Sequence, residues 1–156
     1  MLRSPVVTLF DELRGVLAAF DRDGIDYALV GGLAVAIWGA PRATKDIDLL
    51  IQPQDRDRAM KAAAGLGFTL AALPMEFKDG TTMQRVTKID ANADAMTLDL
   101  MLVDRSLAAA WQSRARLPFG DASVSVVSRE ALIGMKARAA RPIDLVDVQN
   151  LQEVDR

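Results

Sequence analysis

Three aspartates embedded in apolar stretches are the residues best suited to chemistry in this chain. Asp46 and Asp48 alternate with hydrophobic residues in DIDLLI, and Asp99 lies in the equally apolar TLDLML. In a strand, residues two apart share a face, so Asp46 and Asp48 point together while Ile47 and Leu49 face the core. Carboxylates this close repel one another unless a cation lies between them. The pattern favours a metal site, although exposed acids at a strand end, or a salt-bridged Asp99, would also fit it.

A pair of glycines precedes the first two acids. Gly31 and Gly32 follow the strand-like IDYALV and open the short helical stretch LAVAIWG. Glycines at a strand-to-helix junction let backbone N–H groups approach an anion, assisted by the N-terminal dipole of the helix. A plain tight turn explains the pair equally well when it is taken alone. Its position shortly before Asp46 favours a phosphate-binding turn beside the acids.

The chain contains neither histidine nor cysteine. This composition excludes disulfides, Ser-His-Asp triads, Cys-His pairs and ordinary zinc sites, because each needs a thiol or an imidazole. Any metal must then be held by oxygen ligands, which Mg²⁺, Ca²⁺ and Mn²⁺ prefer. Carboxylates and basic side chains are what remains for acid–base and electrostatic chemistry.

Length and composition indicate one ordinary globular domain. The chain has 156 residues, of which 51% are hydrophobic, and a net charge of −2. Without a long basic run, the chain has no strong electrostatic signal for binding nucleic acid. A local basic patch would still be compatible with this net charge. Asp11 and Glu12 interrupt the apolar N-terminal pattern, and no apolar stretch is long enough to span a membrane. We expect a cytoplasmic protein with no membrane partner.

Periodicity and breakers predict alternating helices and strands. Ser4 and Pro5 favour a helix start, Ser128 favours another, and Pro142 suits the first residue of a last helix. We expect a single compact α+β domain with a mixed β-sheet flanked by helices. Its parts are an N-terminal helix (1–24), a sheet core (25–104) and a helical C-terminal part with a short strand (105–156). Predicted helices cover about 5–23, 33–39, 54–65, 105–114, 128–140 and 142–154; predicted strands cover 25–30, 46–51, 68–74, 83–90, 95–103 and 122–128, with a polar turn at 91–94.

Taken together, these motifs resemble the nucleotidyltransferase superfamily. Its signature is an apolar residue, Gly-Gly or Gly-Ser, a spacer, Asp-x-Asp, and a third Asp on a later strand. Val30-Gly31-Gly32, Asp46-Ile47-Asp48 and Asp99 match these parts in order.

A narrower resemblance is to the AbiEii-like enzymes of abortive infection and type IV toxin–antitoxin systems. In these, Arg-x-Thr/Ser-x-Asp-x-Asp follows the Gly-Gly helix, as Arg42-Ala43-Thr44-Lys45-Asp46-Ile47-Asp48 does in this chain. They also carry a helical lysine, then an arginine, then Asp-x-x-Asp opening the next helix. The matching residues are Lys136, Arg141, Asp144 and Asp147, so the similarity covers roughly residues 25–150.

The resemblance implies Mg²⁺-dependent transfer, with Mn²⁺ as a substitute, of a nucleoside monophosphate from an NTP to an acceptor hydroxyl. Asp46 and Asp48 would hold the metal of the triphosphate, and Asp99 would complete a second metal site and help to deprotonate the acceptor. The phosphate-binding and nucleotide-binding residues would be Gly31, Gly32, Arg42, Thr44, Lys45, Lys136, Arg141, Asp144 and Asp147.

Several of these roles stay open at the level of sequence. Thr44 would donate a hydrogen bond to the nucleotide or simply cap its loop. Asp144 and Asp147 would orient Lys136, bind base or ribose, or only complement the helix dipole, and Arg141 would pair with either acid.

The acceptor and the biological role also stay open. The acceptor would be RNA or a small hydroxylated molecule, and the protein would be the toxin-like component with a cognate antitoxin as partner. Many relatives carry a further helical region that helps to select the acceptor, whereas this sequence ends soon after Asp147. The alternatives are a binding module without turnover, and an antitoxin-like enzyme that nucleotidylates a partner protein.

Overall fold

The computed structural model describes residues 5–40 and 43–154 as alternating helices and strands. The helices are α1 (Pro5–Arg22), α2 (Gly31–Ile37), α3 (Arg56–Ala64), α4 (Ala108–Gln112), α5 (Arg129–Ala139) and α6 (Pro142–Glu153), with short 3-10 helices at Pro53–Asp55 and Arg105–Leu107. The strands are β1 (Ala28–Val30), β2 (Asp46–Ile51), β3 (Leu70–Ala71), β4 (Met75–Glu76), β5 (Thr82–Ile89), β6 (Ala95–Leu102), β7 (Ala115–Phe119) and β8 (Ala122–Val126).

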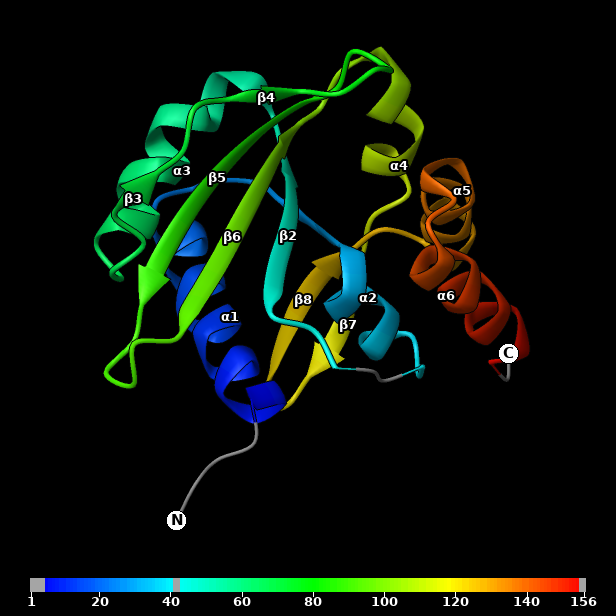
Figure 1. Ribbon diagram of the computed structural model, residues 1–156, viewed down its shortest axis with the longest axis horizontal. Coiled ribbons are helices and arrows are strands. Elements are labelled where there is room, and N and C mark those ends of the chain that lie inside the picture. The colour runs from blue at the N-terminus through cyan, green and yellow to red at the C-terminus, as the bar shows by residue number, and fades with distance from the viewer. Residues whose placement is uncertain (1–4, 41–42, 155–156) are drawn as a thin grey trace.

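All the strands belong to one mixed sheet, which confirms the predicted fold class. Its order is β3-β5-β6-β2-β1-β8-β7, and β4 also pairs with β5 (Figure 1). The β2–β6 and β1–β8 pairs are parallel, whereas the remaining neighbours are antiparallel. The two strands that carry the three aspartates, β2 and β6, are therefore neighbours near the middle of the sheet.

Helices cover the sheet in two groups. Helix α1 contacts α3 and β2, while α5 packs against α6 and also contacts α2 and α4 (Figure 1). As expected from alternation, Ile47, Leu49 and Ile51 are fully buried, opposite Asp46 and Asp48. None of the helices that the structure describes is long and apolar enough to cross a membrane.

The predicted helix starts in the C-terminal part are confirmed. Ser128 precedes α5, and its hydroxyl accepts a hydrogen bond from the backbone N–H of Ala131 at 3.0 Å. Pro142 is the first residue of α6, where its missing N–H costs nothing. Ser4 lies outside the described residues.

Strand β7 is not predicted by the sequence pattern. Its sequence, ARLPF, places Pro118 in mid-strand, which usually argues against a strand because proline cannot donate to the ladder. The sheet order explains the exception, since β7 is the last strand and pairs only with β8. The C-terminal part of the chain thus contributes two strands rather than one.

The hairpin between β5 and β6 differs from the prediction by one residue. The turn begins at Asp90 rather than at 91, because the Asp90 carboxylate accepts hydrogen bonds from the backbone N–H groups of Asn92 and Asp94. The ladder accordingly starts with Ile89 opposite Ala95. A shift of one residue changes which face every side chain meets, and here it decides the partner of Asp99.

Candidate active site

The three aspartates converge, as the sequence predicts. In the parallel β2–β6 ladder, Asp48 lies directly beside Asp99, and Asp46 lies beside Thr97. The charge of the Asp99 carboxylate accordingly acts on Asp48. The Thr97 hydroxyl donates to Asp46 Oδ1 at 2.6 Å, which fixes the rotamer of that carboxylate.

Asp48 is the most electrostatically strained of the three. Burial and then the neighbouring Asp99 and Asp46 carboxylates raise the pKa of Asp48 to about 7, against the lowering influence of Lys136. Burial and like charges both favour the protonated form of a carboxyl group. A nearby cation is needed to favour the charged form. The charge of Lys136, a residue of α5, therefore acts on the acidic site.

Gly31 lies against the Asp48 carboxylate. Its φ of +73° is in the left-handed region, and a Cβ added there would lie 2.8 Å from Asp48 Cγ. Only glycine combines this backbone conformation with so close an approach. The first glycine of the pair therefore makes room for the acid, whatever its N–H group binds. Gly32 is buried in the first turn of α2.

We expect Gly31→Ala to weaken both the fold and the acid site. The positive φ and the contact with Asp48 predict a loss of about 1–3 kcal/mol in the free energy of unfolding. The added Cβ should also push the Asp48 carboxylate away from its neighbours and weaken metal-dependent nucleotide binding. Urea denaturation and nucleotide titration measure the two effects.

Gly134→Ala is the matched control, because Gly134 lies inside α5 and an added Cβ would meet nothing within 4 Å. It should leave nucleotide binding unchanged and stabilise the fold by up to about 1 kcal/mol. Equal stability and equal nucleotide binding in the two variants would contradict the close approach of Gly31 to Asp48.

Arg85 is a member of the site that the sequence did not reveal. It lies opposite Asp99 in the β5–β6 ladder, and its Nε and one terminal nitrogen donate to the two Asp99 oxygens at 2.8 and 2.9 Å. Asp99 is therefore both a member of the acidic cluster and a salt-bridged residue. Bidentate pairs of this kind are among the stronger charge-assisted hydrogen bonds in proteins.

A second, buried charge cluster joins α5 to α6. Lys136 Nζ lies 3.3 Å from Asp144 Oδ1 and 3.0 Å from Asp147 Oδ2, and neither carboxylate has exposed surface. The Arg141 side chain adds hydrogen bonds to both Asp144 oxygens at 2.7 and 3.1 Å. Burial alone would raise the pKa of Asp144, but these cationic partners hold it below its usual value. In this structure the two acids orient Lys136.

The remaining predicted residues lie around the start of β2. The Thr44 hydroxyl oxygen accepts a hydrogen bond from the Asp46 backbone N–H at 3.4 Å, and Lys45 is exposed. Arg42 lies outside the described residues.

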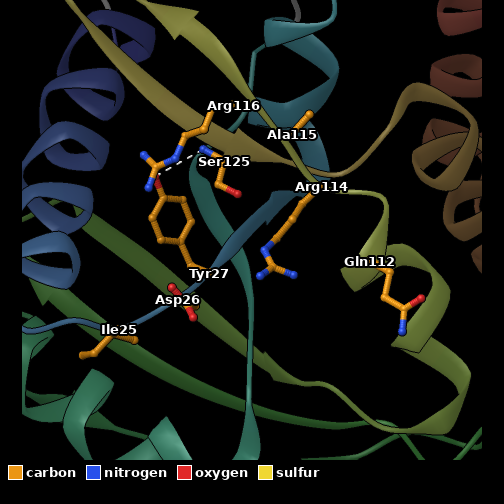
Figure 2. A pocket seen from close by; sticks show the side chains of 8 residues that line it. All are labelled: Ile25, Asp26, Tyr27, Gln112, Arg114, Ala115, Arg116 and Ser125. Atoms are coloured by element: carbon orange, nitrogen blue, oxygen red, sulfur yellow. Dashed lines mark hydrogen bonds between the residues drawn. The ribbon is translucent and has the colours of Figure 1, made fainter.

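A pocket of about 370 Å³ lies away from these acids (Figure 2). Because β1 runs antiparallel to β2, with Ala28 beside Leu50 and Val30 beside Asp48, residues before Ala28 lie at the opposite end of the pair. The pocket thus belongs to a different part of the sheet from the aspartates. It is lined by Ile25, Asp26, Tyr27, Gln112, Arg114, Ala115, Arg116 and Ser125.

Comparison with known proteins agrees with this geometry. Residues 15–155 match the family described as the nucleotidyl transferase AbiEii toxin of type IV toxin–antitoxin systems. The chain belongs to the AbiEii nucleotidyltransferase family. A search of curated proteins gave no match.

Solved structures similar to this AbiEii-family chain share its fold. A lincosamide antibiotic adenylyltransferase, LnuA, in a lincomycin-bound crystal structure, is 16% identical with a TM-score of 0.64, over 93% of this chain and 97% of that one. The antibiotic-resistance factor ANT(2'')-Ia is 19% identical with a TM-score of 0.65, over 94% and 82%. An antigenic nucleotidyltransferase-like protein from Paracoccidioides brasiliensis is 20% identical with a TM-score of 0.55, over 90% and 74%. At these identities the likeness concerns the fold.

The AbiEii-family acid site fits a divalent cation in part. Asp46 and Asp48 offer oxygen ligands, and the raised pKa of Asp48 marks a carboxylate that lacks sufficient positive charge. Both Asp99 oxygens are bound by Arg85, and the described residues include no group of three or more acids arranged as a complete ligand set. Asp99 therefore fits a cation only after Arg85 has moved.

We expect Asp48→Asn to stabilise the AbiEii-family domain when no metal is added. The folded-state pKa of Asp48, about 7, lies above its ordinary value of 3.8. The wild type therefore loses stability as the pH rises between these values, and asparagine does not. The free energy of unfolding of the variant should exceed that of the wild type by about 1–2 kcal/mol near pH 8. Near pH 4 the two proteins should be equally stable.

Urea denaturation in a chelator at the two pH values measures this difference. Asp94→Asn, in the exposed turn before β6, is the control for the same chemical change. A wild type as stable as Asp48→Asn near pH 8 would show that Asp48 is not strained.

Proposed function

We propose that the protein transfers a nucleoside monophosphate from an NTP to a hydroxyl group of an acceptor in a Mg²⁺-dependent reaction. The new bond joins the acceptor oxygen to the α-phosphorus, the bond to the β-phosphate oxygen breaks, and pyrophosphate leaves. The observation that carries this proposal is the convergence of Asp46, Asp48 and Asp99 on two adjacent parallel strands. Family membership supports the general activity, and the finer assignments below are ours.

The acids have separate roles in this proposal. Asp46 and Asp48 would hold the cation that accompanies the triphosphate, and Thr97 would keep the Asp46 carboxylate in place. Asp99 would face the acceptor hydroxyl and help to remove its proton. When bound, the divalent cations neutralise charge on the phosphate oxygens and on the attacking oxygen.

In this proposal Gly31, Gly32 and Lys136 would bind the triphosphate. Backbone N–H groups at the glycines would face the β- and γ-phosphates, because Gly31 already lies against Asp48. Lys136 would add positive charge on the α5 side, held in position by Asp144 and Asp147. Arg141 would support the same cluster through Asp144, so we assign the two acids to positioning rather than to binding of base or ribose.

Two classes of acceptor remain under the proposal. The family description points to a toxin, for which RNA is the acceptor we infer. The similar structures of LnuA, a lincosamide antibiotic adenylyltransferase, and of the antibiotic-resistance factor ANT(2'')-Ia favour a small molecule instead. The net charge of −2 argues mildly against a long nucleic acid. Because NTPs are its substrates, we place the reaction in the cytoplasm.

A non-catalytic binding module is the second candidate, favoured by one observation. Arg85 already neutralises Asp99, so the third acid could serve structure alone. Retention of all three acids on one face favours catalysis, since a binder of nucleotide or of a partner protein does not need Asp99 beside Asp48.

Incubation of the protein with each α-labelled NTP, Mg²⁺ and cell extract tests the proposed function. Label should enter RNA, a small molecule or a protein, and the labelled fraction identifies the acceptor. Labelled protein would indicate the antitoxin-like alternative. Nucleotide binding without any labelled product, across all four nucleotides, would favour the binding module.

A further inference from the structure

We propose that Arg85 is an internal counter-ion of the acidic site, which holds Asp99 while no metal is bound and competes with the divalent cation for that carboxylate. This inference rests on the proposed function, because it concerns how the same site acquires its metal. It assigns to Arg85 a positioning role that neither the family motif nor the comparisons contain.

The burial of the two partners is unequal, and this asymmetry is the first argument. The Asp99 side chain is 5% exposed, whereas that of Arg85 is 40% exposed. A buried carboxylate beside two others must either pair with a cation or bind a proton, because an unpaired buried charge is costly. The half-exposed guanidinium can move into water at little cost. Arg85 is therefore the partner able to leave.

The geometry of the contact is the second argument. Both Asp99 oxygens accept hydrogen bonds from Arg85, so a cation cannot bind them at full strength while the guanidinium stays. The hydrogen bonds to Asp99, together with the charges of Asp46 and Asp48, raise the pKa of Arg85. Arg85 thus interacts with all three acids that would hold the metal, and a bound cation would repel it.

The consequence is a metal site that is weak until Arg85 has another partner. The triphosphate of an incoming nucleotide carries the negative charge to which a displaced guanidinium binds well. Metal alone should therefore bind poorly to the wild type, and removal of the Arg85 charge should strengthen the binding of metal.

Direct titration with Mn²⁺ in the absence of nucleotide, followed by electron paramagnetic resonance, tests the inference without measuring activity. Arg85→Gln should bind Mn²⁺ about ten- to hundredfold more tightly than the wild type, the factor expected from a lost charge-assisted hydrogen-bonded competitor. Arg85→Lys keeps the charge but loses the bidentate contact, so its Mn²⁺ affinity should lie between those of the wild type and Arg85→Gln. It also serves if the glutamine variant fails to fold.

Two further variants show whether the effect runs through Asp99. Lys88→Gln removes one positive charge from the opposite face of β5, where Lys88 pairs with Glu12, and should leave Mn²⁺ affinity unchanged. In an Asp99→Asn background, Arg85→Gln should no longer tighten binding, because the contested carboxylate is gone.

The possible results separate this inference from the proposed function. Equal Mn²⁺ affinity in the wild type and Arg85→Gln, or weaker binding in the variant, would overturn the counter-ion role while leaving Mn²⁺-nucleotide binding intact. Absence of Mn²⁺ binding in every variant, with and without ATP, would overturn both.

Discussion

Asp99→Asn should abolish nucleotidyl transfer while leaving nucleotide binding largely in place. In the proposed reaction Asp46 and Asp48 would still hold the cation of the triphosphate, but the acceptor hydroxyl would lose the carboxylate that we propose faces it. Loss of one electrostatic element of this kind costs on the order of 3 kcal/mol in the activation free energy, which is at least about a hundredfold in rate. Label transfer to the identified acceptor and titration with Mg²⁺-nucleotide measure the two quantities on the same preparation.

Asp94→Asn controls for the change itself, since Asp94 precedes β6 in an exposed turn and should keep wild-type transfer. Asp48→Asn provides the contrast, because it should weaken Mg²⁺-nucleotide binding directly. Wild-type rates in Asp99→Asn would refute the proposed role of the third acid, and equal loss of binding in both variants would show that the acids are not divided between nucleotide and acceptor.

Lys136→Met should be among the most destabilising substitutions in the chain. It leaves Asp144 and Asp147 with no exposed surface and with one fewer cation between them. Removing one partner of a buried ion pair typically costs about 3–5 kcal/mol. Arg141 still compensates Asp144, so we expect a loss of about 3 kcal/mol in the free energy of unfolding, measured by urea denaturation.

Arg138→Met, on the exposed side of the same helix, is the matched control and should change stability by no more than about 0.5 kcal/mol. Adding Asp147→Asn to Lys136→Met should recover part of the lost stability, because it removes a buried negative charge that the lysine no longer offsets. A Lys136→Met protein as stable as the wild type would mean that the lysine is not needed to hold α6 against α5.

Strand geometry predicted part of the acidic cluster, but not that β2 and β6 are neighbours. Period-two alternation places Asp46 and Asp48 on one face, and the apolar residues around Asp99 mark a second buried strand. Lys136, Asp144 and Asp147 were placed through resemblance to a family, since nothing in their spacing shows that α5 and α6 pack face to face. That packing is a tertiary contact which periodicity does not describe.

The pairing of Arg85 with Asp99 depends on a single turn residue. With a turn at 91–94, Asp99 would meet Val86; with the turn opened at Asp90, it meets Arg85. The difference depends on whether the Asp90 side chain caps the turn, which it does through two backbone N–H groups. An Asp at the first turn position is a weak signal for such a cap, and counting the ladder from it would have identified the pair.

The most direct test of nucleotidyl transfer compares α-labelled with γ-labelled NTP in parallel reactions with the same acceptor and Mg²⁺. The proposed reaction predicts that label from the α-phosphate enters the acceptor, that label from the γ-phosphate leaves in pyrophosphate, and that both signals vanish in Asp99→Asn. Label from the γ-phosphate in the acceptor would show phosphoryl transfer instead, and tight nucleotide binding with neither signal would show that this acidic site binds without catalysis.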